Sequence, residues 1–161
     1  MRQIGPAIDR SSQLAPDIHL PGIDGQQYSI SQYKGQVIVV ALWAPWCIPC
    51  RSELPALGHL YDAYKDDGLV ILGIGVEDSP LSIKGAAREA QAAFPILIDL
   101  TSASLKLFKA SGVPTTLIID RKGRFVLFPD PRTDLATPWI IGPREWDAPE
   151  IRQQIAELLA E

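Results

Sequence analysis

Both cysteines of this 161-residue chain lie in one short stretch, WAPWCIPCRSELP, which spans residues 43–55. Cys47 and Cys50 are separated by two residues, and the chain has no other cysteine. Two thiols at this spacing can form a disulfide and open it again, because the second thiol can attack a mixed disulfide formed on the first. The spacing therefore predicts a reversible two-electron switch, with Cys47 as the nucleophile and Cys50 as the resolving thiol.

Three other roles compete for the two cysteines. A structural disulfide over so short a loop would stabilise the fold little, because entropic stabilisation grows with loop length. A zinc site needs about four Cys or His ligands, and the chain adds only His19 and His59, which lack a paired spacing. Two thiolates suffice for Cu(I), so a copper-handling protein remains the alternative from another class.

The residues around the cysteines predict the elements that position them. Residues 37–43, VIVVALW, form a continuous apolar run that is typical of a central strand buried on both faces. A helix is expected from about Ile48 towards Lys65, with a kink at Pro55. Cys47 would then lie at the helix N-terminus, where free N–H groups and the helix dipole favour the reactive thiolate.

The rest of the chain alternates predicted strands and helices. The turn Asp24-Gly25 predicts a β-hairpin between two short apolar segments. The further elements that we expect are a buried strand over 69–76, a helix over 80–93, a strand at FPILID, a helix at SASLKLFKAS, an antiparallel pair TTLIID and RFVLF, a long connection over 129–147, and a last helix that Asp147 and Glu150 cap as a capping box. This order predicts an α/β sheet covered by helices.

Composition limits the possible partners and the domain organisation. The chain is 47% hydrophobic and 21% charged, as is usual for one soluble domain, and we assign residues 1–15 to a flexible tail or linker and 16–161 to the domain. A net charge of −4 without a basic stripe argues against nucleic acid as a partner. The longest apolar run is shorter than a spanning helix, and the first residues do not resemble a signal peptide. If the natural protein is exported, its targeting or anchor segment is missing here.

Residues before and after the cysteines complete a known pattern. Trp43 and Ala44 precede the WCxxC motif, Pro55 follows it, and residues 112–116 read GVPTT just before the predicted hairpin. With these features the chain resembles the thioredoxin superfamily. The resemblance implies a cis peptide bond before Pro114, and a peptide groove that Val113 and Pro114 form opposite the cysteines. An ordinary trans proline in a turn is the alternative.

A narrower resemblance covers about residues 15–160. The leading hairpin, CRSELP, the central insert and the late GPREWD segment are similar to the TlpA/ResA type of thiol–disulfide oxidoreductase in the bacterial cell envelope. That resemblance implies a thioredoxin fold with an N-terminal β-hairpin and a central insert, its mixed sheet flanked by helices. It also implies a periplasmic or otherwise extracytoplasmic protein, tethered to the membrane in full length.

The same resemblance implies the reaction and the partners. We expect a monomer that reduces disulfides in client proteins, such as apocytochrome c or a copper-site protein, without an organic cofactor or metal. Electrons would come from a membrane thiol relay. The alternatives are Cu(I) handling by the same dithiol in oxidase assembly, or a disulfide oxidant or isomerase.

Three further residues near the motif carry expectations. The buried aspartate of thioredoxin corresponds to Ala41, so that proton carrier is absent. Some ResA-type members use an acidic residue of the insert, and here Glu77, ahead of Asp78, is expected to accept the proton of Cys50. The alternative is that both acids cap the next helix or face solvent.

Three tryptophans carry further expectations. Trp46 is expected to contact the client peptide, or else to pack over the active-site turn. The rings of Trp139 and Trp146 are expected to fasten the long connection to the core.

Overall fold

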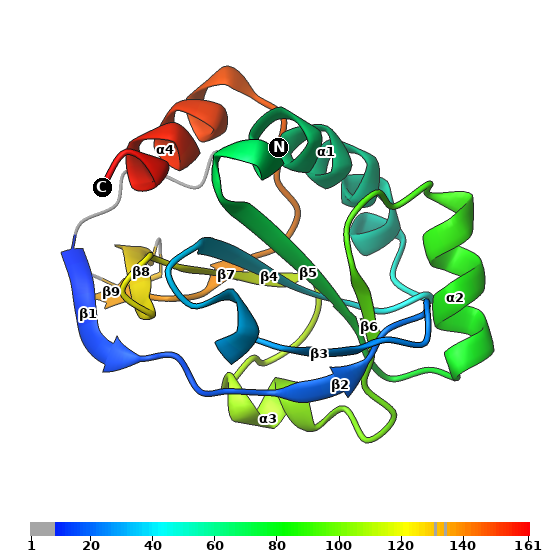
Figure 1. The fold of residues 1–161 in the computed structure, drawn as a ribbon. Helices are drawn as coiled ribbons and strands as arrows, with labels where there is room; N and C mark the ends of the chain where they lie inside the picture. Colours follow the sequence, from blue (N-terminus) through cyan, green and yellow to red (C-terminus); the bar gives the residue numbers. More distant parts are fainter. Residues whose placement is uncertain (1–8, 131, 134) are drawn as a thin grey trace.

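The computed structural model describes residues 9–130, 132–133 and 135–161 and shows a sheet with helices on both faces (Figure 1). The strands are β1 (Asp9–Leu14), β2 (His19–Pro21), β3 (Gln27–Ser29), β4 (Val37–Trp43), β5 (Leu69–Gly75), β6 (Ile96–Ile98), β7 (Thr115–Ile119), β8 (Arg124–Pro129), β9 (Ala136–Thr137) and β10 (Ile140–Ile141). The α-helices are α1 (Ile48–Tyr64), α2 (Pro80–Glu89), α3 (Ala103–Leu107) and α4 (Pro149–Leu159), and single 3₁₀ turns span Ser31–Tyr33 and Lys65–Asp67.

The main sheet has the strand order β1-β8-β7-β4-β5-β6, with β10 beside β7 and β9 beside β8. Strand β4 pairs in parallel with β5 and antiparallel with β7, so the sheet is mixed. Strands β2 and β3 form a separate antiparallel ribbon, which is the predicted hairpin. In Figure 1, α1 and α4 lie above the sheet, and α3 and the ribbon lie below it. This is the predicted mixed sheet flanked by helices.

Strands β4 and β5 lie inside the main sheet and are completely buried. Every residue of β4 and of β5 is buried, as the continuous apolar runs predicted. The two strands run in parallel with Val37 opposite Leu69 and Trp43 opposite Gly75. Since β4 ends at Trp43, the strand stops a few residues before the cysteines, which are themselves part of the buried core.

Helix α1 begins at Ile48 with Cys47 as its N-cap residue, and a proline lies in its first turn. Proline is suited to this position because the N–H it lacks would be unpaired there. The buried face of the helix carries Cys50, Glu53, Leu54 and Leu57, at the three- and four-residue spacing of one helical stripe. One of these four residues is a carboxylic acid, and the others are apolar.

The first strand corrects part of one expectation. We assigned residues 1–15 to a flexible tail, but residues 9–14 form β1, which pairs antiparallel with β8. The polar sequence DRSSQL carries no apolar alternation, whereas an edge strand is held by main-chain hydrogen bonds. Residues 1–8 of the expected tail lie outside the described residues.

The start of helix α4 corrects a second expectation. The predicted capping box is wrong, because the N-cap of α4 is Ala148 and no side chain caps it. The Asp147 carboxylate instead accepts a hydrogen bond from Nε of Arg152 at 2.9 Å. The long connection over 129–147 also contains β9 and β10, which extend the sheet beside β8 and β7.

Candidate active site

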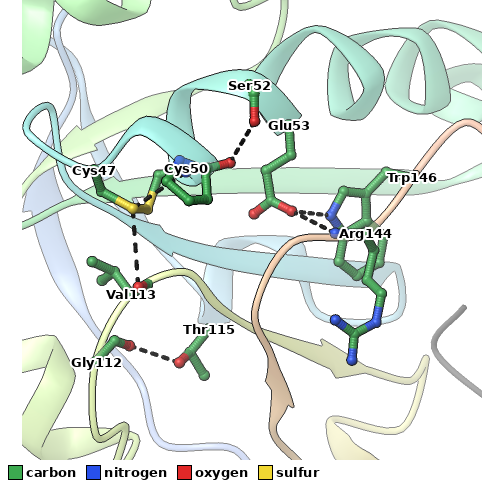
Figure 2. The surroundings of a disulfide bond; sticks show 10 residues. Cys47, Cys50, Ser52, Glu53, Gly112, Val113, Thr115, Arg144 and Trp146 are labelled. Carbon is green, nitrogen blue, oxygen red and sulfur yellow. Dashed lines mark hydrogen bonds between the residues drawn. A yellow bond between two sulfur atoms is a disulfide. The ribbon is translucent and has the colours of Figure 1, made fainter. Parts of the chain in front are cut away.

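The two cysteines form a disulfide at the N-terminus of α1 (Figure 2), and their Cα atoms are 5.2 Å apart. The backbone N–H of Cys50 donates to Sγ of Cys47 at 3.3 Å. Cys47 is 5% exposed and Cys50 is fully buried. A partner can therefore reach only the sulfur of Cys47, and the helix N-terminus directs an N–H at that sulfur, where it stabilises a thiolate.

The loop before β7 faces the disulfide. The Val113–Pro114 peptide bond is cis, which confirms the prediction from the sequence. The carbonyl oxygen of Val113 lies 4.0 Å from Sγ of Cys47. Among the described residues, nothing accepts a hydrogen bond from the Val113 N–H. This N–H is therefore available to the main chain of a peptide that reaches Cys47.

Hydrogen bonds hold this loop from both sides. The Thr115 hydroxyl donates to the carbonyl of Gly112 at 2.7 Å, as Figure 2 shows. On the other side, the N–H of Gly142 donates to the carbonyl of Pro114 at 2.9 Å. The second bond ties the loop to the connection that precedes α4.

Exposed apolar residues lie next to Cys47 in the sequence. Trp46 is 58% exposed and Ile48 is 79% exposed, and they flank Cys47 in the chain. Large apolar side chains this exposed are suited to contact with a partner. Trp46 is thus largely open to solvent beside Cys47, and its contact with a client stays a prediction.

The two acidic residues that the sequence singled out make hydrogen bonds to other partners. Glu77 follows β5, is exposed, has a φ of 54°, and donates its N–H to Oγ of Ser102 at 2.9 Å. The Asp78 carboxylate accepts the N–H of Ser79, the N-cap residue of α2, at 2.7 Å. In the described parts of the chain, no hydrogen bond or ion pair joins either carboxylate to the cysteines.

Glu53, one helical turn after Cys50, is a site residue that was not predicted from the sequence. Its side chain is 2% exposed. Its Oε2 accepts a hydrogen bond from Nε1 of Trp146 at 2.8 Å and another from the N–H of Arg144 at 3.1 Å (Figure 2). Both donors belong to the connection before α4, about 90 residues along the chain. Glu53 is thus the buried carboxylate that shares the inner face of α1 with Cys50.

Burial raises the pKa of Glu53 from its usual value of 4.5 to about 7. The hydrogen bonds from Trp146 and Arg144, together with the charge of the Arg144 side chain, lower the pKa and only partly offset burial. A carboxyl group with a pKa near neutral pH can both accept and donate a proton under physiological conditions. This acid was visible in the sequence as a glutamate three residues after Cys50, on the face that the helical spacing buries.

The described parts of the chain hold neither a metal-binding cluster nor a membrane-spanning helix. No cluster of three or more His, Cys, Asp or Glu side chains there is arranged to hold a metal ion. None of the helices in the same ranges combines the length and the apolar character of a membrane-spanning helix.

Comparison with known proteins gives a consistent result. The model of the AhpC/TSA family matches residues 12–127. A thiol-disulfide oxidoreductase ResA of Geobacillus kaustophilus is 35% identical over 109 residues, which is 68% of this chain and 63% of that protein. The ResA of Bacillus subtilis is 28% identical over 112 residues, again 63% of its length. The match therefore covers less than two thirds of these relatives.

Solved structures match over more of the chain. The crystal structure of a candidate thiol:disulfide interchange protein DsbE from Chlorobium tepidum superposes with a TM-score of 0.79 at 27% identity, covering 95% of this chain and 99% of that one. A second thiol:disulfide interchange protein of Chlorobium tepidum has a TM-score of 0.75 at 23% identity, with coverage of 94% and 99%. The second likeness concerns the fold alone.

Proposed function

Because the chain belongs to the AhpC/TSA family and has a thioredoxin fold, we propose that it is a thiol–disulfide oxidoreductase that reduces disulfides in client proteins. One observation carries the proposal: the Cys47–Cys50 disulfide lies at a helix N-terminus, and the carbonyl oxygen of Val113 lies 4.0 Å from Sγ of Cys47. A structural disulfide would need none of these surroundings.

The first step uses Cys47. Its thiolate attacks one sulfur of the client disulfide, a mixed disulfide forms, and the other client sulfur leaves as a thiolate that takes a proton from solvent. The N–H of Cys50, 3.3 Å from Sγ of Cys47 in the oxidised protein, favours the attacking thiolate.

The second step uses Cys50 and Glu53. The Cys50 thiol gives its proton to the Glu53 carboxylate, and the resulting thiolate attacks Sγ of Cys47. The mixed disulfide breaks, the Cys47–Cys50 disulfide forms, and the second client sulfur leaves as a thiolate that takes a proton from solvent, to which Glu53 returns the proton of Cys50. Two electrons have passed from the dithiol to the client. In this proposal Glu53 takes the role that the sequence suggested for Glu77, because Glu53 is buried on the same helix face as Cys50.

The client would bind along the surface that surrounds Cys47. The unpaired N–H of Val113 would meet the client main chain, and the exposed ring of Trp46 would add apolar contact. Clients such as apocytochrome c or a copper-site protein, an extracytoplasmic location and a membrane thiol relay as electron donor remain part of the proposal. They rest on the sequence resemblance to TlpA/ResA-type proteins.

The reduction potential of the Cys47–Cys50 pair tests the direction of electron flow. Trp46 lies next to Cys47, so its fluorescence in graded thiol buffers should report the redox state. A value near that of thioredoxin, about −270 mV, supports client reduction. A value near that of a strong oxidant, about −120 mV, would reverse the proposed direction.

A further inference from the structure

We propose that Trp146 is a positioning residue for the resolving step, because its indole N–H fixes the orientation of the Glu53 carboxylate. This inference rests on the proposed function and names a residue that acts through Glu53. Trp146 is fully buried, and its Nε1 lies 2.8 Å from Oε2 of Glu53 (Figure 2). Its role therefore goes beyond the expected one of fastening a loop.

The geometry leaves one carboxylate oxygen for the thiol. The indole of Trp146 and the N–H of Arg144 both donate to Oε2 of Glu53. No donor in the described parts of the chain reaches Oε1 of Glu53. Two donors on one oxygen hold the carboxylate in a single orientation, so that Oε1 is the oxygen open to a proton from Cys50.

Breaking the hydrogen bond between Trp146 and Glu53 would also cost free energy of folding. A buried N–H without an acceptor loses its water and gains nothing in return. Trp146 and Glu53 therefore satisfy each other, and the Arg144 N–H is the second donor to the same carboxylate oxygen. The pairing joins α1 to the connection before α4, and the same connection binds the carbonyl of Pro114 through Gly142. One segment thus supports both the proton acceptor and the peptide groove.

The charges around Glu53 define what Trp146 adds. The Arg144 side chain is the charged group that acts on the Glu53 carboxyl, and its Nη1 donates to the carbonyls of Ile141 and Pro143. On the outer side, Nδ1 of His59 on α1 lies 3.5 Å from Oδ2 of Asp147. Because a hydrogen bond to the charged form favours ionisation, loss of the indole donor should raise the pKa of Glu53 further.

The test is W146F, which keeps an aromatic ring and removes the N–H. The matched control is W139F, which removes an indole donor that binds the carbonyl of Phe108 at 2.9 Å, away from any carboxylate. In the oxidised protein, ¹³C NMR follows the Glu53 carboxyl against pH, and the His59 ring is followed by its own resonances. We expect the Glu53 midpoint to rise by about one pH unit in W146F and to stay in place in W139F.

The kinetic readout is the pH profile of the resolving step, measured in the mixed disulfide that the reduced protein forms with a client peptide. In W146F its acidic limb should move upward by about one pH unit, and W139F should retain the wild-type profile. An unchanged Glu53 midpoint in W146F would overturn the proposal. A shifted midpoint with an unmoved kinetic profile would also overturn it; if E53Q leaves the profile unmoved too, the proton step of the proposed function fails with it.

The wild-type protein supplies a measurement that does not depend on the folding of W146F. The indole N–H resonance of Trp146 should titrate with the same midpoint as the Glu53 carboxyl, and this pH dependence should disappear in E53Q. An indole resonance that ignores pH in the wild type would contradict the pairing.

Discussion

At the scale of single residues, the carboxylate of the site comes from the helix and not from the sheet. Ala41 on β4 lies between Gly73 on β5 and Thr116 on β7, so this part of the sheet carries no acid. Glu53 instead reaches the interior from α1, where its burial raises its pKa to about 7. The raised pKa of Glu53 affects both the pH dependence of protein stability and the proton transfer that we propose.

The raised pKa of Glu53 predicts a pH-dependent cost to stability. The fold favours the neutral acid, so its contribution is fully present below pH 4.5 and is lost as the pH rises through about 7. In the oxidised protein, E53Q should therefore gain about 3 kcal/mol of unfolding free energy relative to wild type between pH 4.5 and 8, to order of magnitude. Urea unfolding at both pH values measures this.

The control for that experiment is E157Q, an acid-to-amide change on the exposed face of α4. Its stability relative to wild type should not change with pH between the same limits. An E53Q difference that stays flat with pH would contradict a raised pKa for Glu53.

The two cysteines should also differ in reactivity. Cys47 lies at the helix N-terminus and receives the N–H of Cys50, whereas Cys50 is fully buried. In the reduced protein near pH 7, iodoacetamide should alkylate Cys47 at least about tenfold faster than Cys50. Peptide mapping by mass spectrometry measures both rates, and equal rates would contradict the assigned roles.

At the scale of elements, the loops at the far end of β4 are fastened by one side chain. Arg121, in the turn between β7 and β8, donates to the carbonyl of Leu159 at 2.8 Å, to that of Asp67 at 3.1 Å and to that of Gly35 at 3.0 Å. It thereby joins the end of α4 to the loops that precede β4 and β5. These contacts stabilise the scaffold and lie apart from the disulfide.

Replacing Arg121 should therefore separate stability from chemistry. R121A leaves three backbone carbonyls without their charged donor, and we expect a loss of about 2 kcal/mol in unfolding free energy. The reduction potential of the cysteines should remain that of the wild type. Chemical unfolding and thiol-buffer titration of one preparation measure both quantities, and a shifted potential would show that this cluster reaches the site.

At the scale of the whole molecule, the sequence predicted what short-range patterns determine. The apolar runs predicted β4 and β5 because both strands are buried on both faces. The GVPTT segment led to the cis bond through a family resemblance. Strand β1 was not predicted, because its pairing with β8 depends on main-chain hydrogen bonds and not on apolar side chains.

The role of Glu53 was not predicted from the sequence, for a different reason. A glutamate on a helix is exposed by default, and its burial here depends on Trp146, which lies 93 positions away in sequence. Only the folded chain brings these two side chains together. Helical spacing placed Glu53 on the buried face, but nothing local indicated the indole that it would meet there.

The proposed recognition of clients depends on the molecular surface around Cys47. Trp46 is 58% exposed beside the reachable sulfur, so W46A should weaken binding of protein clients. We expect KM to rise about fivefold or more for a disulfide-bonded peptide, with little change in the rate for a small organic disulfide. L81A, which removes an exposed leucine on α2, is the control. Equal losses for both substrates would assign Trp46 to the chemistry and not to client binding.

The most direct measurement of the central claim is trapping of the mixed disulfide. Reduced C50S and C47S are each mixed with a disulfide-bonded client peptide, and the products are weighed by intact-mass spectrometry without reductant. We expect one covalent peptide adduct in C50S, linked through Cys47, and almost none in C47S, because Cys50 is buried. An adduct that forms mainly in C47S, or equally in both variants, would contradict the assignment of Cys47 as nucleophile and Cys50 as resolving thiol.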